Sequence, residues 1–146
     1  MYVLIQDGKV RKYPYSISLL KQDNPGTSFP QNISDELLES YGVFKVVPTP
    51  VPPYNKKTES IVRNLEQLNG TWVETWSVEL IDEESAATNI RGYRTKLLKE
   101  SDWTQLVDSP LNADTKLAWA LYRETLRMIP QQAGFPWNVT WPPQPQ

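Results

Sequence analysis

The chain of 146 residues contains no cysteine and no histidine. Their absence excludes disulfide bonds, zinc sites built from cysteine and histidine, thiol nucleophiles and catalytic triads with an imidazole base. A catalytic or metal site would therefore have to use oxygen groups alone, such as a pair of carboxylates. We expect a protein with no cofactor and no metal site.

Long runs of one kind of residue are also absent. The chain has 15 basic and 17 acidic residues, with a net charge of −2. The basic residues form no stripe, so we expect no nucleic-acid partner. No segment approaches the roughly 18 consecutive apolar residues that a membrane-spanning helix needs. The first ten residues lack the basic start and apolar core of a signal peptide, and we expect no membrane partner.

The residues that are present predict an α+β fold. Residues 1–47 are expected to form a small N-terminal unit that begins with a β-hairpin, because Asp7-Gly8 favours a tight turn between two segments of strand-forming residues. Two short helices should follow, with Ser16 and Ser34 as their N-caps. A strand over residues 43–47 completes this unit.

A proline-rich linker, residues 48–57, and a second β-hairpin, residues 58–81, are expected next. The prolines favour an extended chain, which is either a spacer or a peptide that docks in an aromatic groove. Asn69-Gly70 is a strong signal for the turn of the hairpin. Trp72 and Trp76 lie on the same side of its second strand. They either pack on a core or form an exposed platform for a sugar or peptide.

Residues 82–146 are predicted to form a C-terminal antiparallel helix pair with an extended aromatic tail. Asp82 and Asn112 are the expected N-caps of the two helices, over residues 83–99 and 113–128. The predicted buried stripe of the second helix follows helical spacing. It consists of Ala118, Leu121, Tyr122, Thr125, Leu126 and Ile129.

The tail after Pro130 carries large side chains at alternating positions. Phe135, Trp137, Val139 and Trp141 would share one face if the chain were extended. Such a face must be covered, either by the rest of the chain or by a partner. Trp137 and Trp141 are therefore candidate partner-binding residues.

The second helix contains a second candidate. Trp119, Arg123 and Arg127 follow one another at intervals of four residues, so Arg123 could stack on the Trp119 ring. Tryptophan and arginine are enriched at the centres of protein interfaces. The alternative is a solvated basic face that bridges to Asp102 or Asp108, in the turn between the helices, or to Glu124. Asp102 and Asp108 in that turn could form a carboxylate pair, although caps of turns are their more usual role.

These residues form a series with distinctive order and spacing: R-x-x-R…L-L…SDWTQL…D-S-P-L…W…YR…LR-x-IP…FPW-x-V-x-WP-x-P. Over about residues 82–145 the chain resembles the bacteriophage tail assembly chaperone family. The N-terminal half is similar to a region often fused to this module in phage tail proteins. The motif positions carried over are Arg94, Ser101, Asp102, Trp103, Leu106, Asp108, Trp119, Tyr122, Arg123, Leu126 and Arg127.

This resemblance implies a non-enzymatic role in building a phage tail. The expected partner is a tail, tail-fibre or baseplate protein, met in the host cytoplasm during assembly. The protein either leaves after assembly or stays in the virion tail as a structural part, and family analogy suggests a homo-oligomer within a symmetric assembly. A carbohydrate-binding module that uses Trp72 and Trp76 is the alternative.

Overall fold

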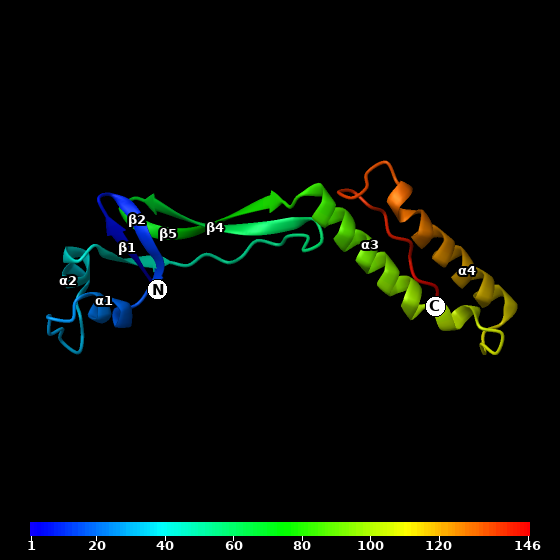
Figure 1. The fold of residues 1–146 in the computed structure, drawn as a ribbon, viewed down its shortest axis with the longest axis horizontal. Helices are drawn as coiled ribbons and strands as arrows, with labels where there is room; N and C mark the ends of the chain where they lie inside the picture. The colour runs from blue at the N-terminus through cyan, green and yellow to red at the C-terminus, as the bar shows by residue number, and fades with distance from the viewer. The chain divides into compact units, whose positions relative to one another are not determined.

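The computed structural model describes all of residues 1–146 and divides the chain into two compact units. Unit 1 comprises Met1–Pro52 and Ile61–Ser77, and unit 2 comprises Pro53–Ser60 and Val78–Gln146. The predicted α+β class is confirmed: a five-stranded mixed sheet is followed by C-terminal helices (Figure 1). None of the helices combines the length and apolar character needed to cross a lipid bilayer.

The sheet joins both predicted hairpins. Its strands are β1 (Tyr2–Gln6), β2 (Lys9–Tyr15), β3 (Val43–Val47), β4 (Glu59–Leu68) and β5 (Thr71–Leu80). They are arranged in the order β2-β1-β3-β5-β4. β1 runs antiparallel to β2 and β3, whereas β3 pairs in parallel with β5. The sequence predicted each hairpin but not the parallel pairing that connects them.

Both hairpin turns have the predicted geometry. Asp7 and Gly8 have φ angles of 52° and 71°, and Asn69 and Gly70 have φ angles of 49° and 82°. Two successive positive φ angles are what a type I′ turn requires, and asparagine, aspartate and glycine tolerate them best.

Two short helices cover the N-terminal hairpin (Figure 1). They are α1 (Ile17–Asp23) and α2 (Asp35–Ser40), and the predicted caps Ser16 and Ser34 accept hydrogen bonds from Leu19 N and Leu37 N. The buried core between helices and strands consists of Tyr15, Leu20, Leu38 and Val43.

Gly42 lets the chain turn from α2 into β3. Its φ angle is +71°, and its carbonyl accepts a hydrogen bond of 2.7 Å from Ile5 N. A Cβ atom added here would collide with the Ile5 carbonyl oxygen. Both the backbone angle and the close approach therefore require glycine.

In unit 2, α3 (Glu83–Glu100) and α4 (Ala113–Met128) form the predicted antiparallel pair (Figure 1). The predicted caps are present: Asp82 Oδ1 accepts from Ser85 N, and Asn112 Oδ1 accepts from Thr115 N, both at 2.8 Å. Two 3-10 turns, η1 (Asp102–Gln105) and η2 (Ile129–Gln131), follow the helices. The C-terminal segment runs back along the pair (Figure 1).

The segment before β4 packs on α3 within unit 2. Asn89 Nδ2 donates to Lys57 O at 3.1 Å, and Lys57 Nζ lies 4.1 Å from the centre of the Tyr93 ring. Thr58 is buried, and its carbonyl accepts from Ile81 N. The proline-rich chain ahead of it lies in unit 1, where Thr49 Oγ1 donates to Glu74 O at 2.6 Å. Much of the predicted linker therefore has specific contacts.

Candidate partner-binding module

The end of α3 is held by an arginine from α4. Arg123 Nη1 donates to Leu98 O at 2.6 Å and to Ser101 Oγ at 2.8 Å, and its Nη2 donates to Asp102 Oδ1 at 2.7 Å. The last carbonyls of a helix lack partners within the helix and carry partial negative charge. Arg123, which is only 8% exposed, satisfies one of them and neutralises Asp102.

The SDWTQL segment forms the turn that receives this arginine. Ser101 Oγ donates to Leu97 O and Leu98 O, and Thr104 Oγ1 donates to Ser101 O at 2.6 Å. Both side chains are buried. The hydroxyl groups donate to carbonyl groups that have no backbone partner at the end of the helix. The motif is thus a hydrogen-bonded turn.

Aromatic rings fill the space between the helices. The Trp119 ring packs edge-on against Tyr122 at 5.6 Å between centroids and lies 6.3 Å from the Trp103 ring. Trp119, Tyr122 and Leu126 are the buried members of this cluster, and Trp141 packs against it. Of the two alternatives for Arg123, stacking on Trp119 is wrong, because the guanidinium is directed to the end of α3. The alternative bridge to Asp102 is present, although Arg123 is buried and not solvated.

The buried face of α4 also differs from the prediction. Tyr122, Leu126 and Ile129 are buried as expected, but Leu121 is 61% exposed, and Ala118 and Thr125 are exposed as well. The face is rotated toward Trp119 and Arg123. The pattern of apolar residues predicts that Arg123 is exposed to solvent. In the structure Arg123 is buried, because it bonds to acceptors at the end of α3.

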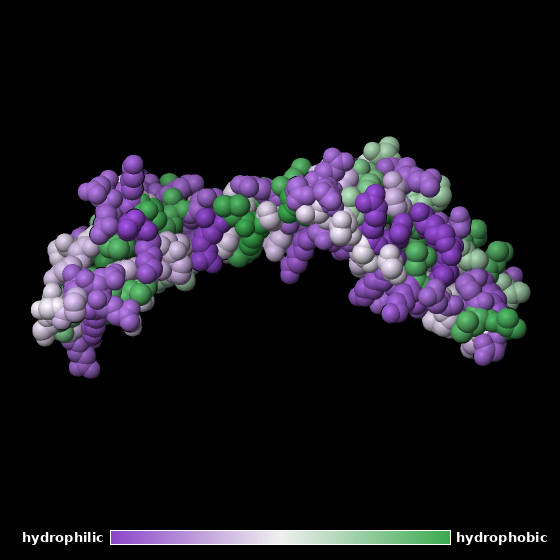
Figure 2. Space-filling model, viewed as in Figure 1, coloured by the Kyte–Doolittle hydropathy of each residue, from purple (hydrophilic) through white to green (hydrophobic).

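As a result, unit 2 exposes an apolar surface. Leu117, Leu121 and Met128 lie at helical spacing on the outer side of α4. Trp103, Leu106 and Val107 in the turn are exposed too. Figure 2 shows hydrophobic residues over this turn and along α4. We call these six residues the apolar ridge.

The tail does not present its large residues on a single face, which corrects the prediction. The chain turns over Gly134–Asn138, where Asn138 N donates to Gly134 O at 2.7 Å, so the alternation of an extended chain is lost. A Cβ atom on Gly134 would collide with Asn138 O. Trp137 consequently lies exposed, whereas Trp141 is half-buried.

Specific contacts hold the tail on the helices. The Trp141 ring packs edge-on against Tyr93 at 4.9 Å, and the Arg91 guanidinium lies 5.1 Å from the centre of the Phe135 ring. Gln132 closes the loop, because its side chain both donates to Thr140 O and accepts from Thr140 N. The rings are covered mainly by the chain itself.

The remaining motif residues lie nearer the surface. Arg127 pairs with Glu124 at 3.3 Å, and both side chains are more than half exposed. Asp108 is exposed. Arg94 is half-buried, and its Nε has no hydrogen-bond partner in the chain. No group of acidic residues is arranged to hold a metal ion.

The hydrogen-bonded turn, the buried arginine and the ordered tail all fall in one segment of the chain. Residues 87–146 match the family model of the phage tail assembly chaperone protein. This match confirms the resemblance to this family for the C-terminal part of the chain. We call residues 87–146 the chaperone module. Neither a search of curated proteins nor a search of solved structures gave a match to the chain.

Outside the chaperone module, the sheet contains a polar cluster that the sequence did not predict. Glu74 on β5 is buried, accepts a hydrogen bond from Tyr13 OH and lies 3.7 Å from Arg63 Nε. Burial, followed by the hydrogen bond and negative charge of Glu74, raises the pKa of Tyr13 to about 12. The sequence held one signal for this cluster: alternation along β5 places Glu74 on the same face as Trp72 and Trp76.

The two tryptophans of β5 are half-buried around this cluster. Trp76 Nε1 donates to Thr49 O at 3.2 Å, and the Arg63 guanidinium lies 5.1 Å from the centre of the Trp76 ring. The ring is therefore engaged within unit 1. This arrangement gives no support to a flat platform for sugars.

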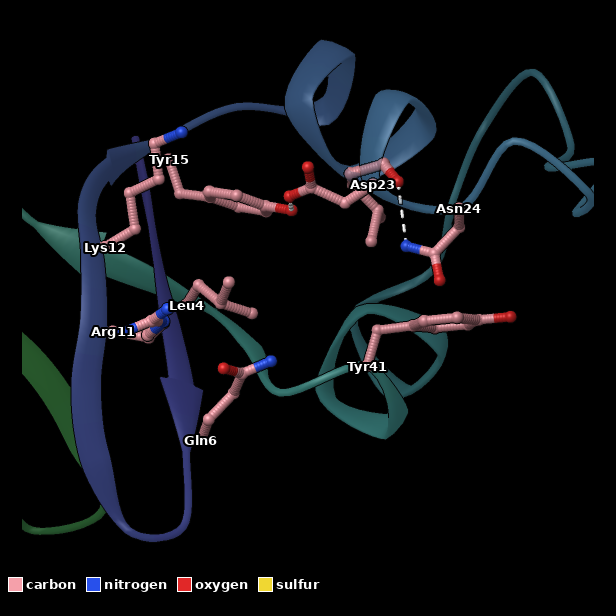
Figure 3. Close-up of a pocket in the computed structure, with 9 residues that line it drawn as sticks. Leu4, Gln6, Arg11, Lys12, Tyr15, Asp23, Asn24 and Tyr41 are labelled. Atoms are coloured by element: carbon pink, nitrogen blue, oxygen red, sulfur yellow. Dashed lines mark hydrogen bonds between the residues drawn. The ribbon is translucent and has the colours of Figure 1, made fainter.

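A hollow of about 650 Å³ in unit 1 lies between the β1–β2 hairpin and α1 (Figure 3). Tyr15 OH donates to Asp23 Oδ2 at 2.6 Å, and Asn24 Nδ2 donates to Leu20 O at 2.9 Å. Burial first, and then Asp23, raises the pKa of the Tyr15 hydroxyl well above its usual value. Tyr15 and Asp23 therefore bond to each other, and Asn24 bonds to the backbone at the end of α1.

Proposed function

We propose that the chain binds a phage tail or tail-fibre protein during assembly of the tail, in the host cytoplasm, and that it does so without catalysis. The match of residues 87–146 to the phage tail assembly chaperone protein carries this proposal. The two aspartates of the turn do not form a carboxylate pair, because Asp102 is bonded to Arg123 and Asp108 is exposed at the surface. This arrangement supports a binding role for the module.

The apolar ridge is the proposed contact surface. Exposed leucine, methionine and tryptophan side chains favour association, because burial of apolar area provides about 25 cal/mol per Å². Arg127 and Trp137 are also exposed and are proposed to take part. Trp119, Arg123 and Trp141 are proposed to act indirectly, by holding α3, α4 and the tail together.

The test is affinity capture of the tagged full chain from infected cells, with the captured proteins identified by mass spectrometry. We expect tail or tail-fibre proteins with the wild type and their loss with Leu117→Gln combined with Leu121→Gln. Lys96→Gln, an exposed change on α3, is the matched control and should leave capture intact. Capture of the same tail proteins by the leucine variant would refute the proposed surface.

A second measurement separates a transient chaperone from a part of the particle. Purified virions are analysed by quantitative mass spectrometry. A constant number of copies per particle identifies a component of the tail, whereas absence from particles that were assembled with its help identifies a chaperone that leaves. Oligomeric state is determined by analytical ultracentrifugation of the full chain.

A further inference from the structure

The two outer strands of the sheet approach each other through their side chains. β2 and β4 lie at opposite ends of the strand order β2-β1-β3-β5-β4. Even so, the Arg63 guanidinium of β4 lies 5.7 Å from the centre of the Tyr13 ring of β2. Tyr13 and Arg63 also share Glu74 of β5 as a partner. The sheet is therefore curled, and its two free edges face a common space.

That space is a hollow of about 440 Å³. It is lined from β2 by Val10, Arg11, Lys12 and Tyr13, and from β4 by Arg63, Asn64 and Leu65. We call it the edge slot. An outermost strand leaves alternate backbone N–H and C=O groups without a partner in the sheet. The edge slot thus offers unpaired backbone groups beside apolar and basic side chains.

The charge of the edge slot has one sign. Arg11, Lys12 and Arg63 line it, and no acidic residue does. Glu74, the carboxylate in contact with this group, is buried and already paired with Tyr13 and Arg63. The exposed cations Arg11 and Lys12 have no ion pair within the chain. A ligand with negative charge would complement them.

We propose that the edge slot binds an extended acidic segment of a partner protein, which adds as a strand to the edge of β2. Main-chain hydrogen bonds to a free strand edge provide affinity, and alternate side chains provide specificity. Arg11 and Lys12 would attract the acidic side chains of the segment, and Val10 and Leu65 offer apolar contacts. This surface lies in unit 1, outside the chaperone module, and does not depend on the function proposed for that module.

A second copy of the chain is a poor occupant. Pairing of two β2 edges would place Lys9, Arg11 and Lys12 of one copy against the same basic residues of the other. Like charges on adjacent strands are destabilising, and lysine on an edge strand is a common protection against self-pairing. The same charges that oppose self-association favour an acidic strand.

The experiment uses three synthetic peptides of about seven residues and the full chain. The first alternates glutamate with valine, the second replaces each glutamate by lysine, and the third carries N-methyl groups on alternate amides of the acidic sequence. Affinity is measured by isothermal titration calorimetry at low and high salt. We expect the acidic peptide to bind, more weakly at high salt, and the other two to bind at least tenfold more weakly.

Charge-reversal variants locate the site. Arg11→Glu combined with Lys12→Glu should lower the affinity for the acidic peptide at least tenfold and raise that for the lysine peptide. Lys21→Glu, the same reversal on an exposed residue of α1 outside the slot, should change neither. NMR shift changes on binding should centre on residues 10–13 and 63–65. Equal binding of both charged peptides, no binding of the acidic one, or shifts centred elsewhere would overturn the proposal.

Discussion

Arg123 and Asp102 form an ion pair of 2.7 Å that joins α4 to the first residue of η1. The two partners differ in their surroundings: the Arg123 side chain is buried, whereas that of Asp102 is 62% exposed. The same guanidinium also donates to Leu98 O and Ser101 Oγ. Most of the contribution of Arg123 to the free energy of unfolding should therefore come from its bonds to the buried acceptors at the end of α3.

Replacement of Arg123 should be costly and replacement of Asp102 should not. Arg123→Met leaves buried acceptors without their donor, and we expect the free energy of unfolding to fall by about 3 kcal/mol. Asp102→Asn removes a largely exposed charge and should cost less than about 1 kcal/mol. Urea unfolding followed by tryptophan fluorescence measures both. Equal losses in the two variants would contradict this assignment.

Two leucines of α4 provide a matched pair for the corrected helix face. Leu126 is fully buried and Leu121 is 61% exposed. Leu126→Ala should lower the free energy of unfolding by about 2–5 kcal/mol, whereas Leu121→Ala should change it by less than about 0.5 kcal/mol. Thermal and urea unfolding of the two variants test this. A larger loss for Leu121→Ala would restore the face predicted from the apolar pattern.

The local elements of this fold could be predicted from the sequence, because their signals are local. Asp82 and Asn112 are good caps, and Asn69-Gly70 fits few structures other than a tight turn. The parallel pairing of β3 with β5 could not be predicted in this way. It depends on contacts between residues far apart in the chain, which no local pattern records.

In the chaperone module too, local features could be predicted and contacts between distant residues could not. Its motif residues could be recognised, and Asp102 was expected in a turn. A bridge from Arg123 to Asp102 was one of the two alternatives, but the burial of Arg123 and its bonds to Leu98 O and Ser101 could not be predicted, because the fold brings these acceptors to it from α3. The prediction for the tail was wrong for a similar reason. It assumed an extended chain with alternating side chains, but the chain turns at Gly134, where Asn138 N donates to Gly134 O.

Stability at high pH should depend on Tyr13. A tyrosine in an unfolded chain loses its proton at about pH 10, whereas the pKa of Tyr13 in the folded chain is about 12. The folded state therefore holds this proton more tightly, and the stabilisation present below pH 10 is lost as the pH rises from 10 to 12.

Tyr13→Phe should reduce this loss but not abolish it, because burial also raises the pKa of Tyr15 and Tyr122. The free energy of unfolding is measured by urea unfolding between pH 8 and about 11.5. Absorbance titration of the native chain should show one fewer late-titrating tyrosine in the variant. An unchanged pH profile in Tyr13→Phe would contradict a raised pKa of Tyr13 in the folded chain.

Two tail tryptophans should differ in their effect on order. Trp141 packs against Tyr93 and the buried cluster of the module, whereas Trp137 is exposed. Trp141→Ala should increase hydrogen exchange of residues 132–146, and Trp137→Ala should leave it close to that of the wild type. Exchange is followed by mass spectrometry. Equal protection in the two variants would mean that the tail is held without Trp141.

The division of the chain into units has a practical consequence for dissecting the protein. The chain crosses between the units three times, since residues 53–60 belong with the helices although residues 61–77 return to the sheet. A fragment cut at residue 87 would keep every matched residue yet lose the strip that supplies Lys57 and Thr58 to unit 2. Asn89 and Tyr93 would then lose their contacts with Lys57, although Tyr93 would keep its contact with Trp141. Supplying residues 53–60 as a separate peptide should restore protection to α3, which makes this strip a separable support of the module.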